Sequence, residues 1–391
     1  MAMPLGLYVS VPFCRTKCSY CNFASDVFSR AVFRRYVDRA CADIENAAAI
    51  AEQMGGRFER DVDSIYLGGG TPTVLDSLEL ERLFVTIGQN FTLQPDVEVT
   101  VECAPGTLSP AILDTLVRCG VNRVSLGVQS FVDAEAASVG RLHQRTTVLD
   151  DIFRLRTAGV TNINLDLIAG LPHQTAESWE TSLAEVIASG APHASVYMLE
   201  VDEDSRLGRE LIAGGTRYHA HFVPDEELTA DLYETACQRL NAAGVCQYEI
   251  SNFARAGYQS RHNLKYWTRQ PYLGFGVDAH SMLSSAEPGL EAVRFSTPDA
   301  LEGYLAQAPR QRIEVTFQAA LEESLFLGLR LAQGVDLQAL RSRFRTLEEF
   351  DSIIAEFSSM GLIGKDKDII RLTPRGRLLS NEVFERFIAV S

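Results

Sequence analysis

The sequence predicts an α/β protein in which a partial (β/α)6 barrel precedes a C-terminal winged-helix-like domain. In the first half of the chain, short apolar runs alternate with amphipathic segments, which is typical of parallel β/α units. Beyond residue 312, three helical segments and a short hairpin follow one another, as in a winged helix. The chain has 391 residues, 46% of them hydrophobic, so it can bury a large core. We expect domains at residues 1–201, 202–311 and 312–391, of which the second extends the barrel.

Six apolar runs predict the barrel strands. Apolar residues at helical spacing predict a first helix over residues 31–54. A closed barrel would need eight units, so six leave one side open for a large substrate, and the chemistry of such barrels lies at the carboxyl ends of the strands. The expected strands are residues 5–11, 64–67, 97–101, 123–128, 162–168 and 194–201.

After residue 201 the alternation stops. We expect a helix at 225–243, a short strand at 247–253 and a glycine-rich return toward the core at 272–280. The C-terminal region predicts three helices, a hairpin and a final helix. The three helices are expected at residues 314–331, 335–344 and 347–360, and the hairpin strands at 362–363 and 370–372.

Three thiols follow the first strand at C-x3-C-x2-C spacing: Cys14, Cys18 and Cys21. Three thiolates can bind three irons of a cubane iron–sulfur cluster and leave the fourth iron open. S-adenosylmethionine (SAM) can chelate that iron through its amino and carboxylate groups. A structural zinc site is the alternative, but zinc needs a fourth ligand, and the next cysteine, Cys41, lies in a predicted helix.

The segment around these thiols carries a family resemblance. Residues 8–13 (Tyr-Val-Ser-Val-Pro-Phe) and Tyr20, just before Cys21, resemble the radical SAM superfamily. Over nearly the whole chain the match is to the oxygen-independent coproporphyrinogen III oxidase (HemN) family, which includes HemN-type oxidases and HemW-type heme chaperones. The resemblance implies a [4Fe–4S] cluster on the three cysteines and SAM contacts from Tyr8 and Tyr20. Ser10 stands where the family usually has His, so the function of that imidazole is absent or supplied elsewhere.

Further candidate SAM contacts follow the ends of the expected strands. The turn at residues 68–72 (Gly-Gly-Gly-Thr-Pro) lets the backbone approach a ligand closely, although such a turn can also be a plain strand-to-helix connection. Glu102 is expected to point outward from the barrel rim, and Asp166 lies inside an apolar strand, where a charge is costly unless it is paired. By resemblance, the SAM contacts are Gly69, Gly70, Thr71, Glu102, Gln129, Arg141 and Asp166; no catalytic residue is assigned.

A second element, Arg-His-Asn-Leu-Lys-Tyr-Trp, occupies residues 261–267. Its imidazole could ligate heme iron while the aromatic rings pack on the porphyrin. Residue types alone favour a buried turn in which His and Asn satisfy backbone groups. The resemblance favours the heme site, because the heme-chaperone branch carries an H-N-x-x-Y-W element. Its members here are His262, Asn263, Tyr266 and Trp267.

Charge and composition limit the partners and the location. A net charge of −15 argues against broad nucleic-acid binding and against adsorption to anionic lipid. No apolar run reaches the length of a membrane span, and the thiols suit a reducing compartment. We therefore expect a cytoplasmic protein without a membrane span, whose association with the inner membrane, if any, is peripheral and through partners.

Three features favour the chaperone branch. Seven residues precede Tyr8, whereas the oxidase branch has an N-terminal extension; Phe23 stands where the oxidase pattern has another Cys; and the H-N-x-x-Y-W element is present. The function predicted is heme binding and transfer to hemoproteins of the respiratory chain, with a heme-linked homodimer. Two alternatives stay open: an oxidase that converts propionates of coproporphyrinogen III to vinyl groups, and a transcription regulator acting through the winged helix, which the net charge disfavours.

Overall fold

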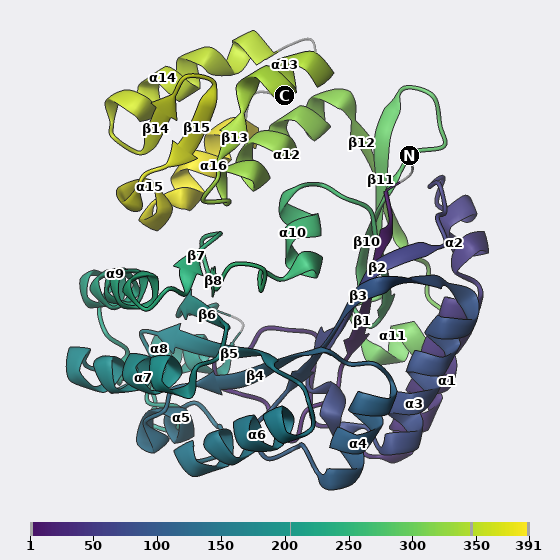
Figure 1. The fold of residues 1–391 in the computed structure, drawn as a ribbon, viewed down its shortest axis with the longest axis vertical. Coiled ribbons are helices and arrows are strands. Elements are labelled where there is room, and N and C mark those ends of the chain that lie inside the picture. Colours follow the sequence, from purple (N-terminus) through teal and green to yellow (C-terminus); the bar gives the residue numbers. More distant parts are fainter. Residues whose placement is uncertain (1–2, 204, 345–346, 389–391) are drawn as a thin grey trace.

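The computed structural model describes residues 3–203, 205–344 and 347–388. Its centre is a curved twelve-stranded sheet with the order β12-β11-β10-β9-β1-β2-β3-β4-β5-β6-β8-β7 (Figure 1). Strands β1 to β6 are parallel and form the predicted partial barrel. They are β1 (Leu5–Val11), β2 (Asp61–Gly69), β3 (Thr92–Cys103), β4 (Arg123–Gln129), β5 (Asn162–Ala169) and β6 (His193–Met198).

Helices between these strands run along the outer side of the sheet (Figure 1). The helix expected over residues 31–54 is divided at Asn46, which caps the first part with its own backbone N–H. The helices of this half are α1 (Ala31–Glu45), α2 (Ala47–Gln53), α3 (Ser77–Asn90), α4 (Pro110–Arg118), α5 (Asp133–Ser138), α6 (Arg145–Thr157) and α7 (Ala176–Ser189).

The strands alternate between an apolar and a polar face. In β1, the side chains of Leu5, Leu7, Val9 and Val11 join the main hydrophobic core beneath the helices. Because successive strand residues face opposite sides, the intervening positions face the barrel interior. In β1 these are Gly6, Tyr8 and Ser10. The barrel interior therefore accommodates polar side chains. The hydrophobic core that stabilises the fold lies on the other face, between the strands and the outer helices.

The sheet extends beyond the predicted six strands on both sides. Strand β9 pairs parallel with β1, from Gly6 opposite Tyr272 to Ser10 opposite Gly276. The glycine-rich segment expected to lead back to the core thus contains a strand. This strand is too short to show a clear alternation of apolar and polar residues, so the sequence did not identify it. The added strands are β7 (Cys246–Gln247), β8 (Asn252–Ala254), β9 (Tyr272–Gly276), β10 (His280–Ser284), β11 (Leu290–Ser296) and β12 (Gln311–Thr316).

Three helices of this middle region, at residues 206–213, 261–267 and 301–305, were not predicted from the sequence. Residues 261–267, taken as a turn, form helix α10, whose N-cap Ser260 accepts a hydrogen bond from the Asn263 N–H. Helix α9 coincides closely with the helix expected at 225–243, whereas the strand expected at 247–253 is the short pair β7 and β8. The helices are α8 (Arg206–Ala213), α9 (Glu226–Ala242), α10 (Arg261–Trp267) and α11 (Leu301–Leu305).

The C-terminal region has a hydrophobic core of its own. It shows the predicted succession of helices and a wing, in which β15 pairs antiparallel with β13 and β14. Its first helix starts later than expected, at Phe317, because residues 311–316 form the edge strand β12. The elements are α12 (Phe317–Leu329), β13 (Val335–Asp336), α13 (Leu337–Arg343), α14 (Asp351–Ser359), β14 (Ile363–Asp366), β15 (Ile369–Leu372), α15 (Pro374–Leu378) and α16 (Ser380–Ile388). Across the described residues, no helix combines the length and apolar character needed to span a bilayer.

Candidate cofactor site

The three cysteines lie in the loop that follows β1. Cys18 is buried, whereas Cys14 and Cys21 are half-buried, and none of them forms a disulfide. The Cys14 N–H donates to the Asp26 carbonyl at 3.0 Å, which holds the start of the loop against its end. Within the described ranges, no three His, Cys, Asp or Glu side chains converge on a single metal position. A cubane cluster does not need such convergence, because each thiolate binds a different iron.

The glycine turn after β2 is fastened to the same loop. The Gly70 N–H donates to the Val11 carbonyl at 2.8 Å, and the Thr71 N–H donates to the Phe13 carbonyl at 2.7 Å. The Thr71 hydroxyl lies 3.9 Å from the sulfur of Cys14. A Cβ on Gly70 would lie 2.7 Å from the Phe13 carbonyl oxygen, so only glycine permits this approach. The turn therefore positions the first cysteine directly.

Glu102, at the end of β3, points into the barrel interior. Its Oε1 accepts a hydrogen bond from the Tyr66 hydroxyl at 2.7 Å. The expectation that it points outward from the rim is wrong: the carboxylate lies above Gly68, where a Cβ would come within 2.8 Å of it. Burial raises the pKa of Glu102 to about 7 despite the hydrogen bond from Tyr66. The interior thus contains a carboxylate that titrates near neutral pH.

Gln129 and Arg141 approach the same region from β4 and the segment after α5. Gln129 is buried and has a φ of 69°, a left-handed conformation that is uncommon for residues other than glycine. The guanidinium of Arg141 passes so close to Gly127 that a Cβ on Gly127 would collide with its Nη2. Nε of Arg141 is buried and has no hydrogen-bond partner among the described residues. This unsatisfied donor fits a polar ligand such as SAM.

Asp166 has the partners that its position in β5 requires. Its Oδ2 accepts from the Ser125 hydroxyl at 2.9 Å, and its Oδ1 accepts from the Asn164 amide at 2.7 Å. Burial raises the pKa of Asp166, although these hydrogen bonds oppose the shift. The partners are neutral, so the carboxylate is held in place without being paired to a cation.

The two tyrosines assigned to SAM occupy different surroundings. Tyr8 lies inside the barrel, with its ring centroid 6.1 Å from that of Tyr66. Tyr20 packs against the small apolar cluster that contains Val139 and Leu171. Burial raises the pKa of both phenols. Both side chains therefore stay neutral.

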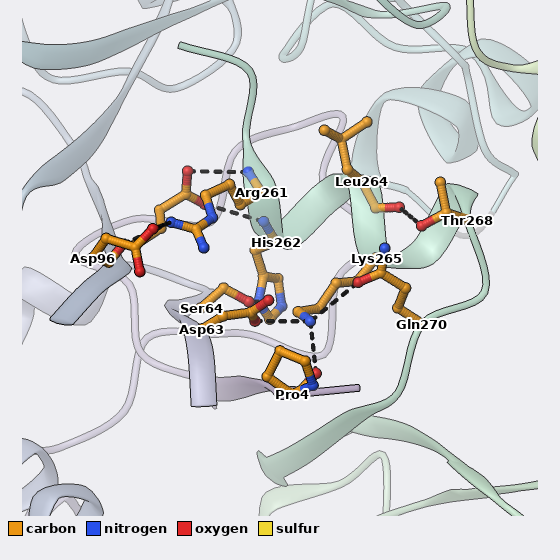
Figure 2. A network of polar contacts seen from close by, with 11 residues as sticks. Pro4, Asp63, Ser64, Asp96, Arg261, His262, Leu264, Lys265, Thr268 and Gln270 are labelled. Atoms are coloured by element: carbon orange, nitrogen blue, oxygen red, sulfur yellow. Dashed lines mark hydrogen bonds and ion pairs between the residues drawn. The ribbon is translucent and has the colours of Figure 1, made fainter. Parts of the chain in front are cut away.

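Helix α10 lies on the inner side of the sheet and is anchored to strands β2 and β3 (Figure 2). The backbone N–H groups of Arg261 and His262 donate to the carboxylate of Glu98 at 3.0 and 3.1 Å. Lys265, only 2% exposed, places its Nζ 2.8 Å from Oδ1 of Asp63. An anion at the N-terminus and a buried ion pair fix the helix at the end of the barrel where the strands begin.

The imidazole of His262 enters the barrel interior from this end. Its Nδ1 lies 3.1 Å from the Ser64 hydroxyl, and its Nε2 lies 2.9 Å from the Tyr266 hydroxyl. The residue is 1% exposed, and burial lowers its pKa to about 3. Its ring centroid lies 5.3 Å from that of Tyr66. In this conformation neither ring nitrogen is available to iron.

The other end of α10 contacts the C-terminal region. Arg269, just past the helix, forms ion pairs with Glu323 of α12 at 2.7 Å and with Glu291 of β11 at 2.9 Å. The guanidinium of Arg330 lies 4.2 Å from the centre of the Trp267 ring. Asn263 is half-buried beside its cap residue. Of the four H-N-x-x-Y-W residues, the structure therefore brings His262 and Tyr266 together and directs Trp267 toward the C-terminal region.

Sequence reasoning missed several interior residues. Tyr66, Ser64, Asn164 and Ser125 hold the predicted residues through side-chain hydrogen bonds. Tyr66, Asn164 and Ser125 each lie between apolar neighbours of a strand, and that alternation is the signal that could have identified them. Ser64 follows Asp63 and lacks this signal. The close contact between Gly127 and the Arg141 guanidinium could not be predicted from the sequence, because the two residues are fourteen positions apart and meet only in the folded chain.

Comparison with known proteins defines the family. A profile of the radical SAM superfamily matches residues 8–186, and one of the HemN C-terminal domain matches residues 315–379. The chain is 35% identical to heme chaperone HemW of Bacillus subtilis (strain 168), covering 97% of this chain and 98% of the relative. The chain belongs to the HemW family. Heme chaperone HemW of Escherichia coli (strain K12) is 30% identical over 99% of this chain and 98% of that protein.

The fold of this HemW family member agrees with a solved structure. The E. coli coproporphyrinogen III oxidase HemN, a radical SAM enzyme, aligns with a TM-score of 0.84 at 24% identity, covering 100% of this chain and 91% of that one. The predicted superfamily, branch and fold class are confirmed. Radical SAM membership implies a [4Fe–4S] cluster and SAM as cofactors. The assignment of individual residues to these cofactors stays a prediction.

Proposed function

We propose that this protein is a heme chaperone that holds a [4Fe–4S] cluster and SAM and transfers heme to respiratory hemoproteins. The observation that carries the proposal is similarity along nearly the full length to proteins named heme chaperone HemW. Retention of the H-N-x-x-Y-W element supports the same reading. Heme carriage needs a binding site that releases its cargo, and a helix held by a few polar anchors is suited to that.

In this proposal Cys14, Cys18 and Cys21 would hold the cluster, and its fourth iron would be open to the amino and carboxylate groups of SAM. Backbone groups of the glycine turn would receive that end, since Gly69 and Gly70 are only partly buried at the end of β2. The remaining contacts surround the nucleoside. Glu102 and Asp166 accept hydrogen bonds from hydroxyl groups, while Arg141 donates from its unpaired Nε. The remaining candidate contacts are Tyr8, Tyr20, Gly70, Thr71 and Gln129.

Heme binding at α10 requires a local rearrangement. His262 can ligate iron only after one of its two hydrogen bonds, to Ser64 or to Tyr266, is broken. Tyr266 and Trp267 then supply aromatic surface to the porphyrin, and Asn263 stays at the start of the helix. We propose that ligation accompanies a displacement of α10 from the barrel interior, because the buried imidazole has no other route to a ligand as large as heme.

The test is a hemin titration of anaerobically reconstituted protein, followed by absorption spectroscopy. Wild type should bind hemin saturably, and His262→Ala should bind it more weakly with a changed Soret band. Tyr266→Phe is the matched control, because it frees Nε2 of His262 without removing the imidazole and should bind hemin at least as tightly as wild type. Wild type that bound no hemin would refute the proposed function, and unchanged spectra in His262→Ala would remove His262 as the ligand.

The oxidase alternative has one supporting observation, the complete set of candidate SAM side chains around the barrel interior. It requires that reconstituted protein convert propionates of coproporphyrinogen III to vinyl groups under strict anaerobiosis. Product analysis by chromatography decides the matter, and an unchanged substrate in the presence of SAM and reductant would end this reading.

The proposed partners follow from the chaperone function. They are heme or another porphyrin, recipient hemoproteins of the respiratory chain and a second copy of the chain joined through heme. Such recipients would bring a cytoplasmic protein to the inner membrane peripherally. Size-exclusion chromatography with and without hemin tests the dimer, and an unchanged elution volume at saturating hemin would argue against it.

A further inference from the structure

Two histidines outside the candidate cofactor site lie ring to ring at the rim of the barrel. Nε2 of His173 lies 3.0 Å from Nδ1 of His219, so the two imidazoles share a hydrogen bond. His173 comes just after β5, and the cysteine loop follows β1. Strands β1 to β5 are parallel, so the loops after them lie at the same edge of the sheet. We call these two residues the histidine pair.

The main chain fixes the histidine pair in place. His173 and His219 have φ values of 67° and 61°, a left-handed conformation that is uncommon for residues other than glycine. The N–H groups of the residues on either side of His219 donate to the carboxylate of Glu210 in α8, at 2.8 and 3.2 Å. Helix α8 is bonded in turn to the cysteine loop, from the Leu207 N–H to the Ser19 carbonyl at 2.8 Å. The pair is therefore attached to the cysteine loop through α8.

The hydrogen bond between the rings leaves one outward nitrogen with a lone pair in either tautomer. If Nε2 of His173 donates, the lone pair is on Nδ1 of His173; if Nδ1 of His219 donates, it is on Nε2 of His219. Within residues 3–203, 205–344 and 347–388, neither ring forms any other hydrogen bond. In both cases the second imidazole accepts from the first and orients it, as the partners of metal-bound histidines do. The pair thus presents one oriented ligand atom.

A single imidazole ligand suits heme iron better than a free divalent ion. Zinc sites in proteins use three or four side-chain ligands. In the part of the chain that the structure describes, no three His, Cys, Asp or Glu side chains come together to hold a metal. Heme iron is already held by its porphyrin and takes an axial ligand such as histidine.

Aromatic surface lies directly beside the ligand. The ring of Phe222 stacks on that of His173, with 4.2 Å between centroids and 28° between planes. The His173 N–H donates to the Phe222 carbonyl at 2.9 Å, so the two residues are held together. Phe222 is 58% exposed, although burial of such a ring is favourable. It can therefore contact a porphyrin whose iron is bound by the pair.

We propose that the histidine pair is an outer heme site, in which one imidazole ligates the iron and Phe222 contacts the porphyrin. The identity of the ligand rests on the proposed function. The outer site differs from His262, which is 1% exposed and has both ring nitrogens engaged in hydrogen bonds. Heme reaches the outer site without a displacement of α10.

The experiment isolates the outer site by titrating the full chain, with its cluster reconstituted, in a His262→Ala background. This background is compared with and without His173→Asn/His219→Asn, because asparagine tolerates the left-handed backbone and an amide is a poor ligand of iron. The probes are hemin and metal-free protoporphyrin IX, which has the same ring and no iron. His280→Ala is the matched control, since His280 is an exposed histidine on β10.

The asparagine substitutions should weaken hemin binding about tenfold or more and remove the Soret band of histidine-ligated heme. They should leave the affinity for protoporphyrin IX unchanged, whereas Phe222→Ala should weaken the binding of both porphyrins. The His280→Ala control should bind both as the background does. A background that binds no hemin, unchanged hemin binding in the asparagine variant, or an equal loss for protoporphyrin IX would overturn the outer site.

The outer site and the chaperone function fail differently. Wild type that binds hemin with an affinity indifferent to the pair, and delivers it to the heme-free form of a respiratory cytochrome, would keep the chaperone and refute the outer site. Wild type that binds hemin through the pair but delivers none would refute the chaperone and keep the outer site. Wild type that binds no hemin would refute both.

Discussion

The hydroxyl of Tyr66 lies 2.7 Å from Oε1 of Glu102 and donates a hydrogen bond to it. The Tyr66 ring also neighbours the imidazole of His262, with 5.3 Å between ring centroids. Side chains from β2 thus connect the helix at one end of the barrel interior with the candidate SAM contacts at the other. Substitutions of these interior side chains should therefore change both the free energy of unfolding and the affinity for the cofactor.

Glu102→Gln should make the protein without SAM more stable at alkaline pH. The folded-state pKa of Glu102 is raised from 4.5 to about 7, so the folded protein resists ionisation. Wild type therefore loses stability as pH rises from about 4.5 to about 7 and keeps that penalty above pH 7. The variant removes a penalty on the order of 1–3 kcal/mol at pH 8, and the difference should shrink toward pH 5. Urea unfolding at both pH values measures it.

The same variant should bind SAM roughly tenfold more weakly at pH 8, because an amide accepts hydrogen bonds less strongly than a carboxylate. Calorimetric titration of reconstituted protein checks this. Equal stability of the variant and wild type at pH 8 would contradict the raised pKa of Glu102. Unchanged SAM affinity would show that Glu102 does not contact SAM.

His262→Gln should make unfolding less sensitive to acid. The pKa of His262 is lowered to about 3 in the folded protein, so its contribution to stability is complete above about pH 6.5 and declines as pH falls toward 3. Removing the imidazole should reduce the slope of unfolding free energy by up to about 1.4 kcal/mol per pH unit between pH 6.5 and 5. Burial also lowers the pKa of His143 and His193, so a residual slope remains. Parallel curves for wild type and variant would contradict a neutral, buried His262.

Asp63→Asn should destabilise the fold by roughly 2–4 kcal/mol, because it leaves the buried ammonium of Lys265 without a counter-charge. The double variant Asp63→Asn/Lys265→Met should recover most of this loss, since no buried charge remains. Asp38→Asn, which breaks the exposed pair with Arg82, is the control and should cost less than about 1 kcal/mol. Chemical denaturation of the four proteins separates these outcomes; an equal cost for the two single variants would mean that Lys265 finds another partner.

Gly127→Ala should weaken SAM binding by about tenfold or more, because the new Cβ would occupy the position of the Arg141 guanidinium. Gly88→Ala is the matched control, since a Cβ there meets nothing within 4 Å. That substitution lies inside α3 and should raise stability by roughly 0.5–1 kcal/mol without changing SAM affinity. If Gly127→Ala bound SAM normally, the orientation of Arg141 would not matter for the ligand.

Features that depend on local pattern could be predicted from the amino-acid order alone. The spacing of Cys14, Cys18 and Cys21 indicated a cluster loop, and the alternation of strands and helices indicated an open barrel with a winged-helix-like end. It also indicated that Asp166 needs partners, because a charge in an apolar strand is costly wherever the strand lies.

The contacts between side chains could not be predicted in this way, because they depend on how distant segments pack. The inward direction of Glu102, the pairing of β9 with β1 and the burial of His262 all depend on residues distant in the chain. Strand periodicity shows that alternate residues share a face, but it does not show what fills the space in front of that face. Helix α10 fills it here (Figure 1). Its anchors are distant in sequence: Asp63 lies 202 residues before Lys265, and Glu98 lies 164 residues before His262. Packing against such distant partners sets the position and pKa of His262, which the H-N-x-x-Y-W pattern alone left open.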